Sequence, residues 1–364
     1  MTTIRTVIIG TGNIANSHLT AIQSLAPRLE IVAAMDVDAE RAKAFCAENK
    51  IPRAYTDLDE LLAKEEPDLV QISTPPGTHC DLSVRCLEAG AWVLCEKPLC
   101  GSLAEMDRIE AAERKSGCYC SSVFQWRFGS MGQHVRSLIQ SNAMGKPLVG
   151  VCNTTWYRDL EYYAVPWRGK WSTELGGPTM GLGIHAMDFF LWLIGDWRDV
   201  RAVMGTLDRP IEVEDVSLAI VRFENGALGS IVNSALSPRQ ETYLRMDFQK
   251  STVELRTLYG YSNAEWQFHL AKNSPHQPEL EKWKMVPTDV RSSHTAQLAA
   301  LADSMQRNER PLVSGPEARR MIEFLTALYK SSLTGETVQR GSIRKGDPFY
   351  EKLYGTVSGR PKWA

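Results

Sequence analysis

Val7-Ile8-Ile9-Gly10-Thr11-Gly12-Asn13-Ile14-Ala15 decides the fold of this chain, because it joins an apolar strand to a helix through a glycine turn. The β-branched run that ends at Ile9 predicts a buried strand of a parallel sheet. Gly10 would make the tight turn, Gly12 would let backbone amides approach a pyrophosphate, and Ala15 would replace the third glycine of the dinucleotide fingerprint. The positive end of the following helix would then face the phosphates. The turn predicts a dinucleotide-binding site made of Gly10, Thr11, Gly12, Asn13 and Ile14.

The next expected strand supplies the acidic residue that the fingerprint needs. Residues 30–35 predict a strand that ends at Asp36, which follows Gly12 by a spacing close to the roughly 20 residues expected. A carboxylate there would accept hydrogen bonds from the ribose diol and repel a 2′-phosphate, which favours NAD over NADP. Arg41 would argue for NADP, but a solvated helical charge near Glu40 is the simpler interpretation. A turn without phosphate, in which Asp36 only caps a helix, is the structural alternative.

Two domains are expected from the pattern of strands and helices. Strands and helices alternate as far as Phe124, which predicts a doubly wound parallel sheet in residues 1–124, an NAD-binding Rossmann domain. Later segments alternate as antiparallel strands do, with Asn225-Gly226 as a hairpin signal, and Trp283–Val286 is expected as one further strand. Residues 125–364 are therefore expected to form a substrate-binding and oligomerisation α/β domain with a large open, mostly antiparallel sheet. The fold class is α/β.

Composition excludes several classes of partner. The 364 residues carry a net charge of −2, so neither nucleic acid nor a membrane is expected as a partner. An apolar strand begins within a few residues of Met1, which leaves no room for a signal peptide and favours a cytoplasmic protein. The eight cysteines are expected to be reduced thiols. The sequence shows no trio of His, Asp or Glu at ligand spacing, so no metal is expected.

The chain resembles the Gfo/Idh/MocA oxidoreductase family over essentially its full length. The matching motifs are GTGNIA at 10–15, Asp36, STPPGTH at 73–79, EKPL at 96–99, and the run from Gly176-Gly177 to Gly183-Ile184-His185-Ala186-Met187-Asp188. This family contains glucose–fructose oxidoreductase, inositol dehydrogenases and many sugar dehydrogenases. The resemblance implies hydride transfer at a carbinol carbon and a homodimer or homotetramer built through the C-terminal sheet.

Two residues are candidates for proton transfer. The resemblance places Lys97 against the nicotinamide and substrate, where partial desolvation would lower its pKa, and Glu96 would fix its position. His185 opens an expected helix, and imidazole titrates in the range useful for an acid or base. Without the resemblance, Lys97 would be an ordinary strand-end lysine and His185 a core histidine. Further residues expected to line the cofactor are Thr74, Pro75, His79, Glu96 and Lys97.

One position departs from the family pattern. Most family dehydrogenases carry an aspartate four residues before the histidine, where this chain has Gly181. Such a carboxylate would orient and stabilise an imidazolium. Either Lys97 and His185 suffice, or another carboxylate enters the site, or the protein binds its ligands without turnover. The carboxylates considered are Asp159, Glu161 and Asp188.

An aromatic and arginine-rich stretch precedes the expected helix. Planar aromatics suit the apolar face of a sugar ring, and arginine suits its hydroxyls or a carboxylate. An aromatic cluster that packs a long loop, or a subunit contact, would give the same pattern. The expected substrate-binding residues are Lys97, Gln125, Arg127, Tyr157, Arg158, Trp167, Arg168 and His185.

These observations predict an NAD-dependent oxidoreductase. It would transfer a hydride from a ring hydroxyl carbon of a sugar, glycoside, anhydrosugar or inositol to the nicotinamide, with Lys97 and His185 handling the hydroxyl proton. One alternative is a glycosidase that retains NAD and eliminates the aglycone after transient ring oxidation. The other is a catalytically silent NAD–sugar sensor.

Overall fold

The chain forms two compact units. A computed structural model describes residues 3–357, 359, 361 and 363. The first unit comprises residues 1–123 and 294–322, and the second comprises residues 124–293 and 323–364. This division differs from the expected domains 1–124 and 125–364 chiefly because residues 294–322 belong to the first unit. Residues 1, 2, 358, 360, 362 and 364 of the expected domains lie outside the described residues.

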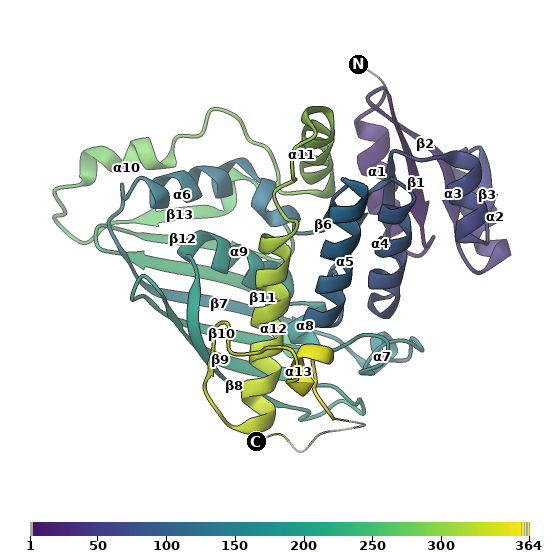
Figure 1. Ribbon diagram of the computed structural model, residues 1–364. Coiled ribbons are helices and arrows are strands. Elements are labelled where there is room, and N and C mark those ends of the chain that lie inside the picture. Colours follow the sequence, from purple (N-terminus) through teal and green to yellow (C-terminus); the bar gives the residue numbers. More distant parts are fainter. Residues whose placement is uncertain (1–2, 358, 360, 362, 364) are drawn as a thin grey trace. The chain divides into compact units, whose positions relative to one another are not determined.

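The first unit is built on a parallel sheet. Within its described residues, six strands pair in parallel in the order β3-β2-β1-β4-β5-β6 (Figure 1). The strands are β1 (Ile4–Ile9), β2 (Leu29–Met35), β3 (Arg53–Tyr55), β4 (Leu69–Ile72), β5 (Trp92–Cys95) and β6 (Cys120–Ser122). This order reverses between β1 and β4, the switch point where doubly wound sheets bind ligands. The predicted Rossmann sheet is confirmed.

Helices of the first unit begin where the sequence places capping residues. They are α1 (Ala15–Ser24), α2 (Ala39–Asn49), α3 (Leu58–Glu65), the short η1 (Pro76–Thr78), α4 (His79–Glu88), α5 (Leu103–Ser116) and α11 (His294–Arg307). Asp57 accepts a hydrogen bond from the Glu60 amide at 2.8 Å, and Ser102 accepts one from the Glu105 amide at 3.1 Å. Asp57 and Ser102 are both of the residue types that favour the first position before a helix.

Helix α11 joins this unit from far along the chain. Its buried apolar residues share one core with Leu19 and Ile22 of α1. Those α11 residues are Leu298, Leu301 and Ala302, a helical spacing that forms one face. The packing brings the first residue of α11, His294, into the first unit.

The second unit is built on a mostly antiparallel sheet. Its described strands are ordered β13-β12-β11-β7-β10-β9-β8-β14, and the β7–β10 pair is parallel (Figure 1). The strands are β7 (Pro147–Tyr157), β8 (Trp197–Gly205), β9 (Val216–Phe223), β10 (Leu228–Ser234), β11 (Leu236–Phe248), β12 (Thr252–Thr257), β13 (Trp266–His269) and β14 (Val338–Gln339). Gly226, with φ +89°, turns β9 into β10 as the Asn-Gly signal predicted. The expected open sheet is confirmed.

Helices complete the second unit. They are η2 (Gln125–Phe128), α6 (Ser130–Gln140), α7 (Leu160–Tyr163), α8 (Pro178–Gly181), α9 (Ile184–Ile194), η3 (Asn263–Glu265), α10 (Gln277–Lys284), α13 (Pro348–Glu351) and α12 (Pro316–Thr334), the last belonging to this unit from residue 323 onward. All residues of α9 are buried, which explains its apolar character on every side. The strand expected at Trp283–Val286 is wrong. Trp283 instead lies in α10, where it and Leu280, three residues earlier, are the buried residues on one face of the helix.

No helix in the described part of the chain is both long enough and apolar enough to cross a bilayer.

Candidate functional site

The glycine turn after β1 has the form that a dinucleotide site requires. Gly10 adopts φ +86°, and a Cβ there would lie 2.8 Å from Cγ2 of Thr74 and 2.9 Å from the Ser73 carbonyl. Only glycine fits so close to the β4 end without strain. A Cβ on Gly12 would meet open space, and Gly12 and Asn13 are exposed. The turn therefore offers accessible backbone beside the start of α1, where phosphates bind.

Asp36 lies beside this turn, at the end of β2. Its carboxylate accepts hydrogen bonds from the Thr11 amide and the Thr11 hydroxyl, both at 2.9 Å, and Nη1 of Arg41 lies 3.6 Å away. Burial raises the pKa of Asp36, but these hydrogen bonds and Arg41 outweigh it and leave the pKa below its usual value. The side chain is therefore an ionised hydrogen-bond acceptor at neutral pH.

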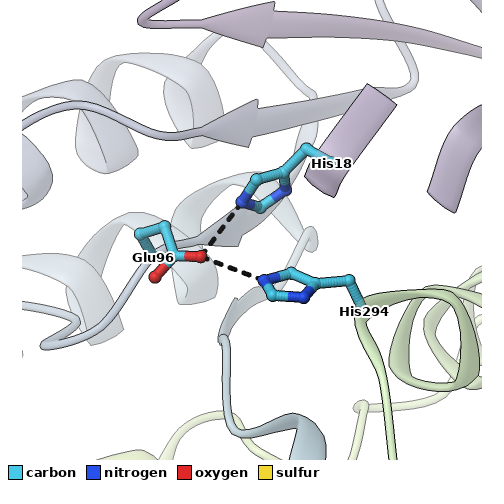
Figure 2. A group of neighbouring side chains, drawn as sticks. All are labelled: His18, Glu96 and His294. Carbon is cyan, nitrogen blue, oxygen red and sulfur yellow. Dashed lines mark hydrogen bonds and ion pairs between the residues drawn. The ribbon is translucent and has the colours of Figure 1, made fainter. Parts of the chain in front are cut away.

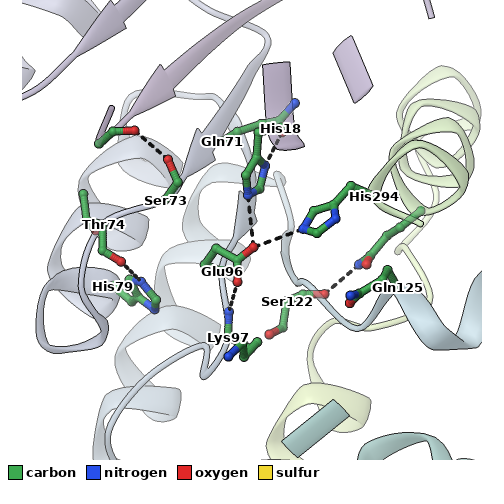
Figure 3. Close-up of polar contacts among 12 residues, drawn as sticks. His18, Gln71, Ser73, Thr74, His79, Glu96, Lys97, Ser122, Gln125 and His294 are labelled. Carbon is green, nitrogen blue, oxygen red and sulfur yellow. Dashed lines mark hydrogen bonds and ion pairs between the residues drawn. The ribbon is translucent and has the colours of Figure 1, made fainter. Parts of the chain in front are cut away.

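His79 holds two loops of the first unit together. Its Nε2 lies 2.8 Å from the Thr74 carbonyl oxygen (Figure 3). Its Nδ1 lies 2.7 Å from the Pro98 carbonyl oxygen, and the side chain is fully buried. Burial lowers the pKa of His79, which favours a neutral ring that donates to one carbonyl at a time. Both ring nitrogens face backbone, so His79 positions the loops after β4 and β5. Pro75, on the first of these loops, is exposed.

Glu96 stands at the centre of a polar cluster at the end of β5. Its Oε1 lies 3.2 Å from Nε2 of His18 and 3.2 Å from Nε2 of His294 (Figure 2). Its other oxygen accepts a hydrogen bond from the Lys97 amide at 3.2 Å (Figure 3). Burial raises the pKa of Glu96, but the contacts with the two histidines outweigh it and hold the pKa well below its usual range. Glu96 thus contacts the backbone of Lys97, and Lys97 itself is half-buried.

In the second unit, His185 lies at the start of α9 beside a tyrosine. Nε2 of His185 is 3.5 Å from the Tyr259 hydroxyl, which accepts a hydrogen bond from Nε2 of Gln125 at 2.6 Å. His185 is 3% exposed and Tyr259 is 43% exposed. The phenol therefore connects a buried imidazole with solvent.

Arg127 does not face an open cleft, contrary to expectation. It is fully buried, and its Nε and Nη2 donate to the two oxygens of Asp188 at 2.7 and 2.6 Å. A buried bidentate pair of this kind needs both partners to avoid an uncompensated charge. Arg127 and Asp188 thus fix η2 against α9. Both carboxylate oxygens of Asp188 accept hydrogen bonds from Arg127.

Close approaches explain the glycines before His185. A Cβ on Gly177 would collide with the Glu214 backbone carbonyl, and one on Gly183 would collide with the side chain of Asn233. Gly181 differs, because the nearest atom to a Cβ there is Oε1 of Glu174, at 3.6 Å. A Cβ at position 181 would therefore make an ordinary van der Waals contact with the Glu174 carboxylate.

Glu174 is the buried carboxylate that the sequence did not reveal. It is 4% exposed and accepts hydrogen bonds from Nη1 of Arg168 at 3.1 Å and from the Gly169 amide at 2.5 Å. Of the carboxylates weighed from the sequence, Asp159 caps α7 through the Tyr162 amide at 2.8 Å, and Glu161 is exposed on that helix.

Glu214 anchors the segment that leads to α9. It is fully buried and accepts hydrogen bonds from the Gly177 amide, the Thr179 amide and the Tyr329 hydroxyl at 3.0–3.1 Å. Burial raises the pKa of Glu214 to about 7, against the opposing effect of these hydrogen bonds. Its charge state therefore changes near neutral pH.

The expected substrate loop packs largely on itself. The Arg168 guanidinium lies 3.8 Å from the ring centroid of Tyr162 and 4.3 Å from that of Trp167. The Arg158 guanidinium lies 5.0 Å from the ring of Trp156. These stacked contacts favour the alternative of an aromatic cluster that packs a long loop. Tyr157, 41% exposed, remains accessible on β7.

Five residues of these clusters escaped the sequence analysis because no motif carries them. They are His18, Glu174, Glu214, Tyr259 and His294. The two carboxylates follow no recognisable spacing, and Tyr259 lies in a loop after β12. His18 lies on the helix that follows the glycine turn. It shares one face of that helix with the buried residues Leu19 and Ile22, and this spacing was the signal that could have predicted its burial.

Comparisons with known proteins match both units. Residues 4–124 match the family model described as an oxidoreductase family with an NAD-binding Rossmann fold, and residues 133–254 match the GFO/IDH/MocA C-terminal domain. D-apiose dehydrogenase from Paraburkholderia graminis is 25% identical over 94% of this chain and 91% of its own length. Myo-inositol 2-dehydrogenase from Thermotoga maritima is 24% identical over 90% of this chain and 96% of its own. The WlbA dehydrogenase from Bordetella pertussis, solved with NADH and UDP-GlcNAcA, superimposes with a TM-score of 0.82 at 27% identity, covering 93% of this chain and 99% of that one.

Proposed function

Because this chain belongs to the Gfo/Idh/MocA family of NAD-binding oxidoreductases, we propose that it oxidises a ring hydroxyl of a sugar, glycoside, anhydrosugar or inositol. Relatives named as dehydrogenases of apiose and inositol support this substrate class. The observation that carries the chemistry is the contact of 3.5 Å between the buried His185 imidazole and the hydroxyl of Tyr259, a residue that is 43% exposed. An imidazole with a hydroxyl path to solvent can exchange the proton that alcohol oxidation releases.

NAD would bind at the turn after β1. The amides from Gly12 to Ile14 would hold the pyrophosphate, and the Asp36 carboxylate would accept hydrogen bonds from the adenosine ribose. Asp36 already accepts hydrogen bonds from the Thr11 amide and hydroxyl, so the carboxylate is oriented and ionised before any ligand arrives. Thr74 and Pro75 on the loop after β4 would line the cofactor.

The reaction breaks one C–H and one O–H bond. The nicotinamide supplies the hydride acceptor when NAD is bound. Either Lys97 or His185 would accept the single hydroxyl proton as the carbinol carbon becomes a carbonyl. The C–H hydrogen would leave with its two electrons as hydride, and the O–H hydrogen would leave as a proton. Glu96 holds the Lys97 backbone through its amide, which would orient the ammonium-bearing side chain.

We further infer that the Glu174 carboxylate takes the place of the family aspartate missing at Gly181. A Cβ at position 181 would lie 3.6 Å from Oε1 of Glu174, so the two positions would deliver a carboxylate to the same place. The carboxylate would stabilise charge on the His185 helix as the aspartate does in relatives. This is why the loss at position 181 does not favour a catalytically silent protein.

The outer face of the second sheet would pair with another copy of the chain. Val203, Leu218, Ile220 and Leu228 are each at least half exposed on adjacent strands β8, β9 and β10. Contiguous exposed apolar side chains of this kind mark interaction surfaces. We propose a homodimer or homotetramer assembled through this face.

The decisive experiment follows NAD reduction by absorbance across a panel of sugars, glycosides, anhydrosugars and inositols. The parent should form stoichiometric NADH with at least one ring polyol, and Lys97→Ala and His185→Ala should each lower kcat. Lys115→Ala is the matched control, because Lys115 is an exposed lysine of the first unit paired with Glu88 at 3.0 Å. Unchanged turnover in Lys97→Ala would remove Lys97 from the reaction.

The panel also distinguishes the two rivals. Aglycone release without net NADH would identify a glycosidase that retains NAD. Thermal stabilisation by NAD and a sugar with no turnover on any polyol would identify a sensor.

A further inference from the structure

Three side chains from distant parts of the first unit converge on one point. His18 lies on α1, Glu96 follows β5, and His294 is the first residue of α11 (Figure 2). Their ligand-type atoms all lie within 4.8 Å of one another. The His18 side chain is fully buried, while those of Glu96 and His294 are 8% and 12% exposed. The cluster is therefore enclosed but retains a narrow opening at His294.

The spacing of the donor atoms suits a small metal ion. Two ligand atoms about 2.1 Å from a tetrahedral metal lie about 3.4 Å apart, or about 3.0 Å for a right-angled pair. Glu96 Oε1 lies 3.2 Å from Nε2 of His18 and 3.2 Å from Nε2 of His294. Two imidazoles on one tetrahedral metal would have ring centroids about 5.2 Å apart. The His18 and His294 centroids are 5.1 Å apart.

The neighbouring hydrogen bonds orient these donors inward. Nδ1 of His18 lies 2.5 Å from Oε1 of Gln71. An amide oxygen only accepts, so Nδ1 carries the proton and a neutral ring turns its Nε2 lone pair toward Glu96. A cation placed between that lone pair and the carboxylate would bind both groups. The Lys97 amide holds the second Glu96 oxygen at 3.2 Å, so a histidine and a carboxylate are both fixed from behind, as they are in metal sites.

We propose that His18, Glu96 and His294 bind one divalent transition-metal ion through Nε2, Oε1 and Nε2. Two imidazoles and one carboxylate favour zinc-like ions over magnesium or calcium, which prefer oxygen donors. Three protein donors leave one position for water. The ion would join α1, the end of β5 and α11, and so tie residues 294–322 to the Rossmann sheet. This site does not depend on the proposed dehydrogenase reaction.

The test measures metal binding directly. Tag-free protein is stripped with chelator and titrated with Zn²⁺ by calorimetry and with Co²⁺ by visible absorption. One equivalent should bind, with cobalt bands of a four-coordinate site and a raised thermal midpoint. Glu96→Gln, which keeps the shape but removes the charge, and His294→Ala, at the open side of the cluster, should each weaken binding at least tenfold and abolish the bands.

His269→Ala is the matched control. Nε2 of His269 lies 3.3 Å from Oε2 of Glu254, but this histidine–carboxylate pair joins β13 to β12 and the histidine side chain is 53% exposed. The variant should bind Zn²⁺ as the parent does. Circular dichroism confirms that each variant is folded. A folded parent that binds well below one equivalent, or a His294→Ala variant that binds as tightly as the parent, overturns the assignment.

Discussion

The Tyr259 hydroxyl lies 3.5 Å from Nε2 of His185 and joins that imidazole to Gln125. The imidazole is almost completely buried, whereas the tyrosine reaches solvent. A phenol in this place can both orient the ring and pass a proton outward. Neither role requires that Tyr259 contribute to substrate affinity.

Tyr259→Phe should therefore lower kcat on the order of tenfold with little change in KM, because it removes the hydroxyl and keeps the ring. The pH profile of kcat should also shift, which a purely structural role would not cause. Tyr243→Phe is the control, since Tyr243 donates to Glu254 at another point of the same sheet. Equal kcat and pH profiles for Tyr259→Phe and the parent would exclude a role in proton transfer.

Glu174→Gln should reduce kcat on the order of tenfold, because the charge that stands in for the family aspartate is lost. Gly181→Asp in the Glu174→Gln background should restore part of the lost kcat, since a Cβ at position 181 would lie 3.6 Å from Oε1 of Glu174. Glu161→Gln, at an exposed position of α7, should leave kcat unchanged. The assignment would be contradicted if steady-state kinetics of the parent and these three variants showed no recovery of kcat from the second substitution.

Glu214→Gln should remove a pH dependence of stability. The pKa of Glu214 is raised from its ordinary 4.5 to about 7, so its stabilising contribution is complete below pH 4.5 and is lost as pH rises through about 7. This rise corresponds to on the order of 3 kcal/mol. Thermal midpoints of parent and variant should agree at pH 5, and the variant should be higher at pH 8. Exposed Glu224→Gln should follow the parent, and parallel pH curves for Glu214→Gln and the parent would refute the expectation.

Asp36→Ala should narrow the preference for NAD over NADP on the order of tenfold, because the carboxylate that repels a 2′-phosphate is removed. Fluorescence titration with both reduced cofactors measures the ratio. Asp38→Ala is the neighbouring control, since Asp38 caps α2 through the Glu40 and Arg41 amides. It should cost about 1 kcal/mol of stability without changing the ratio. An unchanged ratio in Asp36→Ala would remove the ribose assignment.

Ile220→Asp should dissociate the proposed oligomer, because it places a charge on the exposed apolar face at a side chain that is 66% exposed. Light scattering after size-exclusion chromatography gives the mass. Met285→Asp, 69% exposed outside the sheet, should keep the mass of the parent. A parent that is monomeric at micromolar concentration would contradict the assembly.

Local signals carried much of this structure. The strand, glycine turn and helix from Val7 to Ala15 depend on backbone conformation and on the period of apolar residues, which neighbours along the chain specify. The same holds for the caps at Asp57 and Ser102 and for the hairpin at Gly226. Trp283 shows where such local prediction fails. One apolar residue in a short polar segment does not show whether the next buried residue lies two positions away, as in a strand, or three, as in a helix.

Side-chain clusters followed a different rule. Arg127 was expected in a cleft and instead pairs with Asp188, and Oε1 of Glu174 lies 3.6 Å from the place that a Cβ on Gly181 would occupy. No periodicity along the chain records such contacts. They arise when packed helices and strands bring distant side chains together.

The sequence by itself determined the doubly wound sheet, the acidic residue at the end of β2 and the family to which the chain belongs, since each of these is set by residues close together in the chain. Only the tertiary structure decided that His294 meets Glu96 across 198 positions and that His18 meets it across 78. The physical reason is that the apolar face of α11 is buried against α1. This long-range packing, which no local preference of the chain specifies, places His294 at the end of β5.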